Sequence, residues 1–143
     1  MKIQEKSAGE GDDRVKKIIL YLDTASDETV VVLFDGDNLL AEKNWNGYGD
    51  LSERLLMEID LILSENNIKK TELSLIAVND GPGSYTGLRI GVTCANFLAW
   101  SLGIALATGK IENGKLSFAE LEKNHFVLPK YLREAHITAP KKK

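Results

Sequence analysis

The sequence predicts a single α/β domain in which a mixed β-sheet carries helices. Three observations lead to this class: three consecutive strand-like runs separated by turn residues, two longer segments with helical periodicity, and a glycine-rich turn before the second helical segment. The 143 residues suit one core, and a hydrophobic share of 43% with a charged share of 27% is typical of a globular chain.

The first part of the domain is predicted to be an antiparallel meander of three strands. Residues 18–22 are apolar on both alternating positions, as expected for a central strand that is covered on two faces. The β-branched run 29–34 leads into residues 35–38 (DGDN), where Gly and Asn tolerate the positive φ of a hairpin turn. Residues 39–45 alternate more clearly and are predicted to form a third strand nearer an edge.

Two helices and two more strands complete the predicted order βββαβαβ. The first helix begins near Asp50 and buries one apolar stripe, whereas Met57 and Leu61 fall on nearly the opposite side. A buried strand at 73–78, a second helix at 86–102 and a short strand at 104–108 follow. The stripe of the first helix consists of Leu51, Leu55, Leu56, Ile59, Ile62 and Leu63.

The two ends of the chain are predicted to lie outside this lobe, which spans residues 17–108. Residues 1–16 are polar, charged and contain glycine, which predicts a disordered N-terminal tail. Residues 109–143 are too few for a second core. Within them Ser117 and Glu120 have the spacing of a capping box, which predicts a short helix.

Composition argues against several classes of function. The formal net charge is −3 and the dense basic run is confined to residues 141–143, which disfavours a nucleic-acid-binding domain. Cys94 is the single cysteine, so no disulfide forms within the chain, as expected in a reducing compartment. Neither a secretory signal nor a run of about 20 apolar residues occurs, so we expect a cytoplasmic protein without membrane association.

The most informative segment is the glycine-rich turn at 81–91 (GPGSYTGLRIG), between a buried strand and a helix. A phosphate loop is one interpretation, but the Lys-Ser or Lys-Thr pair of a P-loop is missing, and Thr86 stands where a dinucleotide loop has its third glycine. A nucleophile elbow at Ser84 is a second interpretation, but Pro82 and Thr86 occupy the positions that require small glycines.

A structural cause for the glycines is the third interpretation. Gly87 and Gly91 lie four residues apart on one helix face, and each costs roughly 1 kcal/mol relative to alanine. Such a cost is tolerated where another backbone must come very close, so we favour close packing against this face.

Metal and catalytic sites are not indicated elsewhere in the chain. His125 and His136 have no neighbouring cysteine or carboxylate at metal-ligand spacing. An acid–base role for Asp23 is one interpretation, but a turn-forming Asp at a strand end is favoured. Cys94 has no basic neighbour and is expected to be a small buried hydrophobe. We therefore expect no catalytic residue, no metal and no cofactor.

The glycine-rich turn resembles the signature of the TsaB (YeaZ) family, relatives of the glycoprotease-like protein TsaD. Further matches are the DTAS turn at 23–26, LSERLL at 51–56 and PKYLR at 129–133. The resemblance covers residues 17–108 and, through the last match, the C-terminal part. The residues that match the family motif are Asp23, Thr24, Ser26, Gly81, Pro82, Gly83, Ser84, Thr86, Gly87, Arg89 and Gly91.

The resemblance implies one lobe of an actin-like (ASKHA, ribonuclease H-like) fold. It also implies a non-catalytic subunit that binds and supports TsaD in forming threonylcarbamoyl-adenosine beside the anticodon of tRNA, in a pathway with TsaC and the ATPase TsaE. Leu51 stands where the family usually has a histidine. Residues 109–143 would replace the second lobe, either in a naturally shortened member or in a remnant that fuses the two ends.

Surplus apolar surface predicts where a partner binds. Met57 and Leu61 lie off the buried stripe of the first helix, and Trp100 shares a face of the second helix with several polar residues. Trp and Arg dominate binding hot spots, and the family pairs through these two helices. The alternative is that these faces pack on each other or on the C-terminal segment. The predicted partner-binding residues are Arg54, Met57, Leu61, Arg89, Thr93, Asn96 and Trp100.

The predicted partner is TsaD, or a second copy of the chain when TsaD is absent, with tRNA involved only indirectly. Two other classes remain open. One is an enzyme, a glycoprotease-like hydrolase or an ATP-using enzyme, that acts as an obligate dimer and would bind ATP saturably. The other is a direct tRNA-binding module, whose binding would be tight and salt-sensitive.

Overall fold

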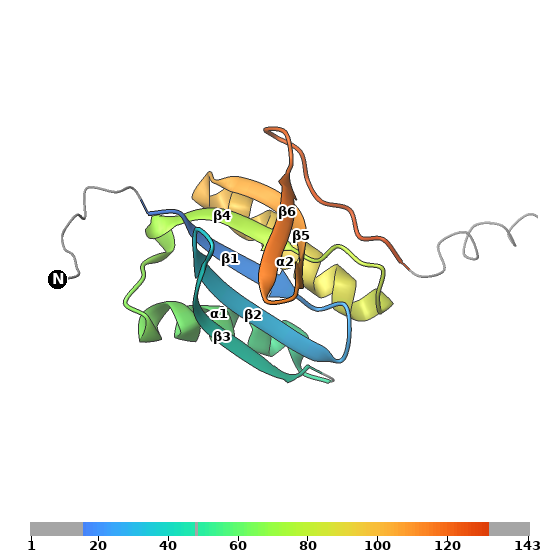
Figure 1. The fold of residues 1–143 in the computed structure, drawn as a ribbon. Coiled ribbons are helices and arrows are strands. Elements are labelled where there is room, and N and C mark those ends of the chain that lie inside the picture. Colours follow the sequence, from blue (N-terminus) through green and yellow to red (C-terminus); the bar gives the residue numbers. More distant parts are fainter. Residues whose placement is uncertain (1–15, 48, 132–143) are drawn as a thin grey trace, which may run out of the picture.

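A computed structural model describes residues 16–47 and 49–131, which form a six-stranded mixed sheet with two helices (Figure 1). The strands lie in the order β3-β2-β1-β4-β5-β6. Along the chain the elements are β1 (Ile18–Asp23), β2 (Glu28–Asp35), β3 (Asn38–Asn46), α1 (Leu51–Glu65), η1 (Lys70–Glu72), β4 (Leu73–Val78), α2 (Tyr85–Leu102), β5 (Ala105–Glu112) and β6 (Lys115–Glu120).

The predicted meander and the mixed sheet are confirmed. β1 pairs antiparallel with β2, and β2 pairs antiparallel with β3. β4 lies parallel to β1 on its other side and parallel to β5 beyond it. The turn between β2 and β3 contains Gly36 at a φ of 60°, as the DGDN pattern predicted. The chain therefore follows the predicted order βββαβαβ and then adds a strand.

That additional strand, β6, stands where a short helix was predicted. The helix prediction from Ser117 and Glu120 is wrong, because these residues pair antiparallel with β5, which itself runs beyond residue 108. Asn113 and Gly114 connect the two strands, with φ values of 55° and 77°. An Asn-Gly pair is the strongest short-range signal for a two-residue hairpin, and here it outweighs the capping-box spacing.

One face of the sheet packs against both helices. Leu20 and Val31 of the sheet, Leu55 of α1, and Val92 and Leu98 of α2 belong to the same buried cluster. The two helices therefore lie side by side on this face, and their outer sides both turn away from the sheet. The predicted buried stripe of α1 is confirmed except at Leu56, which is 48% exposed and lies outside the cluster.

The β5–β6 hairpin arches over the other face of the sheet. This face carries a smaller cluster that includes Tyr21, and Leu116 of β6 packs against it. Although β4 and β5 lie between β1 and β6 in the sheet, Lys17 just before β1 forms an ion pair with Glu120 at 3.8 Å and lies 5.9 Å from the centroid of the Phe118 ring. In Figure 1 the hairpin crosses in front of β1. The hairpin covers a face that has no helix on it within the described part of the chain.

The predicted N-terminal tail, except for Lys16, lies outside the described residues, as does the C-terminal stretch 132–143 with Arg133, His136 and the lysine run. Within residues 16–47 and 49–131, neither helix is long and apolar enough to cross a membrane.

Candidate partner-binding surface and glycine-rich turn

Three glycines allow the turn between β1 and β2 to lie directly against α2 and the turn that precedes it. A Cβ at Gly87 would overlap the carbonyl oxygen of Thr24, and one at Gly91 would overlap the Thr24 hydroxyl. A Cβ at Gly83 would overlap the backbone of Ala25. The Thr24 hydroxyl donates a hydrogen bond to the Gly87 carbonyl at 2.5 Å. The predicted close packing is confirmed at both helical glycines, but another backbone is the neighbour only at Gly87, because Gly91 faces the side chain of Thr24.

Ser84 begins α2 as its N-cap. Its Oγ accepts a hydrogen bond from the Gly87 N–H at 3.1 Å, and its own N–H donates to the Ala25 carbonyl at 2.9 Å. A serine at this position satisfies one of the N–H groups that the helix leaves free. Within the glycine-rich turn, Ser84 thus orders the junction between α2 and the β1–β2 turn.

Asp23 lies in a polar cluster at the end of β1. Its carboxylate accepts hydrogen bonds from the Tyr21 hydroxyl (3.2 Å), the Asn79 side chain (3.1 Å) and the Ala25 N–H (3.0 Å). Burial, and secondarily the charge of Asp23, raise the pKa of Tyr21 well above its ordinary value, so the phenol stays protonated as the donor. Three donors converge on one carboxylate, and this fixes the turn that contacts α2.

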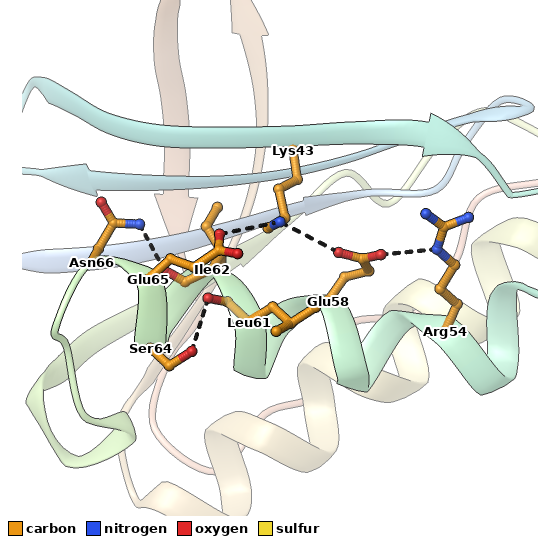
Figure 2. A network of polar contacts seen from close by, with 8 residues as sticks. All are labelled: Lys43, Arg54, Glu58, Leu61, Ile62, Ser64, Glu65 and Asn66. Carbon is orange, nitrogen blue, oxygen red and sulfur yellow. Dashed lines mark hydrogen bonds and ion pairs between the residues drawn. The ribbon is translucent and has the colours of Figure 1, made fainter.

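Charged side chains hold α1 to β3 (Figure 2). The buried Glu58 accepts a hydrogen bond from Arg54 Nε at 2.9 Å and lies 3.7 Å from Lys43 Nζ, which also reaches Glu65 at 3.2 Å. The Arg54 guanidinium lies 5.0 Å from the ring centroid of Trp45. Arg54, a predicted partner-binding residue, is therefore already engaged within the fold, and 36% of its side chain is exposed.

The structure places Met57 and Leu61 on the solvent-facing side of α1. Met57 is 54% and Leu61 40% exposed, and Leu56 adds a third exposed apolar side chain to this helix. Sequence periodicity identified the first two and missed Leu56, because its position by a 100° step falls near the edge of the buried stripe.

The predicted face of α2 is divided between a free part and a covered part. Trp100 is 71% exposed, Phe97 is 57% exposed, and Thr93 is also exposed. Arg89 is exposed and lies over the Tyr85 ring, 5.4 Å from its centroid.

Asn96 belongs to the covered part of this face. Its side chain donates a hydrogen bond to the Val127 carbonyl (3.0 Å) and accepts one from the Val127 N–H (2.9 Å). The alternative that the face packs on the C-terminal segment thus applies to Asn96 and not to Trp100.

The segment 126–131, here called the strap, follows α2 back to the glycine-rich turn. Beyond Val127, the Lys130 N–H donates to the Asp80 carbonyl (2.7 Å), and Lys130 Nζ lies 3.7 Å from the Asp80 carboxylate. Tyr131 forms a β-bridge with Gly83 and packs on Tyr85 with the ring centroids 4.7 Å apart. The described part of the C-terminal family match, residues 129–131, therefore lies beside the glycine-rich turn.

The strap also enlarges the exposed apolar surface of α2. Its Phe126 and Leu128 are 57% and 78% exposed and, with Phe97 and Trp100, line a groove of about 420 Å³. Sequence analysis missed Phe126 and Leu128, because no periodic pattern placed the strap on α2. Asn96, which was predicted to bind a partner, instead holds Val127 by two hydrogen bonds and so positions Phe126 and Leu128 on either side of it.

Among residues 16–47 and 49–131, the other candidate side chains form no metal or thiolate site. No group of three or more His, Cys, Asp or Glu suited to a metal ion occurs in the described ranges. Cys94 is half-buried, and burial raises its pKa to about 12, so it remains a thiol at neutral pH. His125 lies in the loop after β6, with its Nδ1 3.3 Å from the backbone carbonyl of Glu122.

Comparison with known proteins identifies what the chain is similar to. A family model described as TsaD, tRNA N6-adenosine threonylcarbamoyltransferase, matches residues 49–108. TsaB of Bacillus subtilis (strain 168), described as a tRNA threonylcarbamoyladenosine biosynthesis protein, is 38% identical over 89 residues, which cover 62% of this chain and 39% of TsaB. A tRNA N6-adenosine threonylcarbamoyltransferase of Chlorobium luteolum is 35% identical over 101 residues, with 61% of this chain and 29% of the relative covered.

A solved structure extends the likeness to the fold. YeaZ from Pseudomonas aeruginosa superposes with a TM-score of 0.61 at 20% identity, covering 80% of this chain and 71% of the YeaZ chain. This chain spans 39% of the length of Bacillus subtilis TsaB and less of the transferase. The predicted α/β class and the likeness to YeaZ, with its actin-like fold, are both confirmed. The chain is thus similar in sequence to part of Bacillus subtilis TsaB and to part of the TsaD family model, and similar in fold to YeaZ.

Proposed function

We propose that this chain is a non-catalytic subunit that binds TsaD and supports it in forming threonylcarbamoyl-adenosine beside the anticodon of tRNA. Similarity to TsaB and to TsaD-type transferases supports a role in this pathway. The proposal rests on the region that matches these relatives, which is about three fifths of this chain. TsaE and TsaC act in the same pathway, tRNA is reached indirectly through TsaD, and the expected location is the cytoplasm.

The exposed apolar surface of the two helices is the observation that carries the proposal. Leu61 and Met57 on α1, and Phe97 and Trp100 on α2, are 40–71% exposed, and the two helices share one face of the sheet. Large apolar side chains that gather at the surface mark interaction sites, and a buried Trp anchor contributes about 2 kcal/mol or more to binding. The partner-binding surface therefore comprises the outer sides of α1 and α2, together with the exposed strap residues.

The polar groups of the family motif support a structural role for it. Asp23 accepts three hydrogen bonds from groups of the fold, Ser84 caps α2, and Thr24 binds the Gly87 carbonyl. These groups hold α2 against the sheet and so set the position of the surface that its outer side presents. In this proposal the motif builds the binding surface and TsaD performs the transfer.

Co-purification with the TsaD of the same genome tests the proposal. Wild-type chain should co-elute with tagged TsaD, whereas Trp100→Asp and Leu61→Asp should each abolish co-elution because they place a charge in the buried contact. Leu39→Asp is the matched control, since Leu39 is a comparably exposed apolar residue (56%) that lies on β3 and on neither helix. Circular dichroism confirms that each variant is folded. Co-elution of both helix variants at the wild-type level would overturn the assignment of this surface.

Behaviour without TsaD gives an independent outcome. A second copy of the chain should then occupy the same surface, so the wild type should dimerise at high concentration and Trp100→Asp should stay monomeric in size-exclusion chromatography with light scattering. Calorimetric titration with ATP addresses the enzyme alternative. Saturable ATP binding with turnover by the purified chain would contradict the non-catalytic role.

A further inference from the structure

A cavity of about 650 Å³ lies between the C-terminal part of α2, the start of β5 and the loop that joins β6 to the strap. The apolar part of its lining includes Ala99, Ile104 and Leu106. The cavity is distinct from the groove on α2, because Phe97 and Leu128 line the groove and not the cavity. Concave sites of this size with a largely apolar lining are typical of those that bind small molecules.

Two aromatic side chains line the cavity and remain largely exposed. Trp100 of α2 is 71% exposed, and Phe126 at the start of the strap is 57% exposed. Both rings gain free energy when an apolar ligand covers them. The faces of aromatic rings also attract a positive charge, and that of Trp does so most strongly. The two rings therefore favour a ligand that combines an apolar body with a cationic group.

The charged side chains of the lining agree with a cation. They are two carboxylates, of Glu120 and Glu122, against one ammonium group, of Lys123. The Glu120 carboxylate is shared with Lys17, at 3.8 Å. Glu122 forms no ion pair within residues 16–47 and 49–131, so its carboxylate is available to a ligand. Lys123 opposes a bound cation, and removal of its charge should strengthen binding.

The other polar groups around the cavity are mainly acceptors of hydrogen bonds. The helix α2 reaches its C-cap at Gly103, which lines the cavity, and its last turn contains no basic residue. The last carbonyl groups of a helix and the negative end of its dipole favour a cation. His125 Nδ1 lies 3.3 Å from the carbonyl oxygens of both Glu122 and Lys123. The neutral ring therefore donates from Nδ1 and keeps Nε2 as an acceptor.

We propose that this cavity binds a small organic cation that carries an ammonium group on a ring-sized apolar body. The body packs on Trp100 and Phe126, and the ammonium group lies toward Glu122 and the end of α2. The isolated chain is enough to test this site, so its failure would not affect the role proposed with TsaD. Because Trp100 also belongs to the partner-binding surface, the test leaves Trp100 unchanged.

Titration of the purified chain with 2-phenylethylammonium chloride, followed by ¹⁵N NMR, tests the site. We expect a Kd of about 1 mM or lower. The amide signals of Gly103 and Lys123 should move, and that of Ser84 at the other end of α2 should not. The uncharged 2-phenylethanol should bind at least about five-fold more weakly, because it makes no cation–π contact, and the anionic 3-phenylpropanoate more weakly still. N-acetylarginine amide, a protein-like cation without a ring, should also bind more weakly.

Two phenylalanines provide a matched pair of variants. Phe97 and Phe126 are both 57% exposed and both line the groove, but only Phe126 lines the cavity. Phe126→Ala should weaken the binding of 2-phenylethylammonium at least about five-fold, and Phe97→Ala should keep the wild-type Kd. Glu122→Gln should reduce the preference for the cation over the alcohol, and Lys123→Gln should increase it.

Three results would overturn the proposal. The first is the absence of binding of 2-phenylethylammonium at ten times the expected Kd. The second is equal affinity for the cation, the alcohol and the anion. The third is an equal loss of affinity in Phe97→Ala and Phe126→Ala, which would place the ligand in the groove instead of the cavity.

Discussion

Gly91→Ala tests the close contact between α2 and the β1–β2 turn. In a helix that made no such contact, alanine would stabilise the fold by about 1 kcal/mol relative to glycine. Here the new Cβ would overlap the Thr24 hydroxyl and come within 3.0 Å of its methyl group. Overpacking of this kind costs about 1–3 kcal/mol, and displacement of Thr24 would also weaken its hydrogen bond to Gly87, about 1 kcal/mol more. The net expectation is a loss of about 1–3 kcal/mol.

Urea unfolding followed by circular dichroism measures this loss, and a second substitution separates its cause. Thr24→Ala removes the two nearest of the three Thr24 atoms that the new Cβ meets and leaves the Thr24 Cβ at 3.1 Å, so Gly91→Ala should cost less in the Thr24→Ala background than in the wild type. Thr93→Ala, at an exposed position of the same helix, should change stability by less than about 0.5 kcal/mol. A Gly91→Ala variant as stable as the wild type, or additive behaviour of the pair, would refute the reasoning.

Three further predictions concern separate parts of the fold. Glu58→Ala leaves Arg54 and Lys43 without their buried partner. It should lower the free energy of unfolding in urea by about 1–3 kcal/mol, which is less than the loss for a fully buried ion pair. A change below about 0.5 kcal/mol would contradict a stabilising role of these ion pairs. Asn96→Ala should release the strap, seen as faster amide exchange at Val127, while unchanged exchange would contradict the clamp. Burial raises the pKa of Cys94 from 9.0 to about 12, so the unfolded state loses this proton at a lower pH than the folded state. The free energy of unfolding of the wild type should therefore fall between these pH values, and that of Cys94→Ala should fall less. Identical dependence of stability on pH in the two proteins would contradict this expectation.

Much of the fold follows from local pattern. The apolar run of β1, the DGDN turn and the periodicity of α1 each predicted an element that the structure contains, because a central strand, a tight turn and an amphipathic helix each leave a signal within a few residues. The β5–β6 hairpin shows how one local signal can hide another. The capping-box spacing of Ser117 and Glu120 predicted a helix, although the Asn113-Gly114 pair just before it is a hairpin signal. Pairing with β5 makes this segment a strand.

The candidate site could be predicted less completely, since its parts come from distant segments. Helical periodicity placed Trp100 and Leu61 at the surface. It could not show that Asn96 holds the strap, because that contact joins residues 31 positions apart. The sequence did indicate close packing at Gly87 and Gly91, but the fold was needed to show that Thr24 is the neighbour and that Gly91 meets its side chain instead of its backbone.

The affinity of the purified chain for TsaD, measured by isothermal titration calorimetry, tests the central claim most directly. The wild type and Leu39→Asp should bind TsaD equally well, and Trp100→Asp should bind at least about thirty-fold more weakly, since the loss of a buried anchor costs about 2 kcal/mol or more. Equal affinity of the wild type and Trp100→Asp, with both proteins folded, would contradict the claim that the outer surface of α1 and α2 binds TsaD.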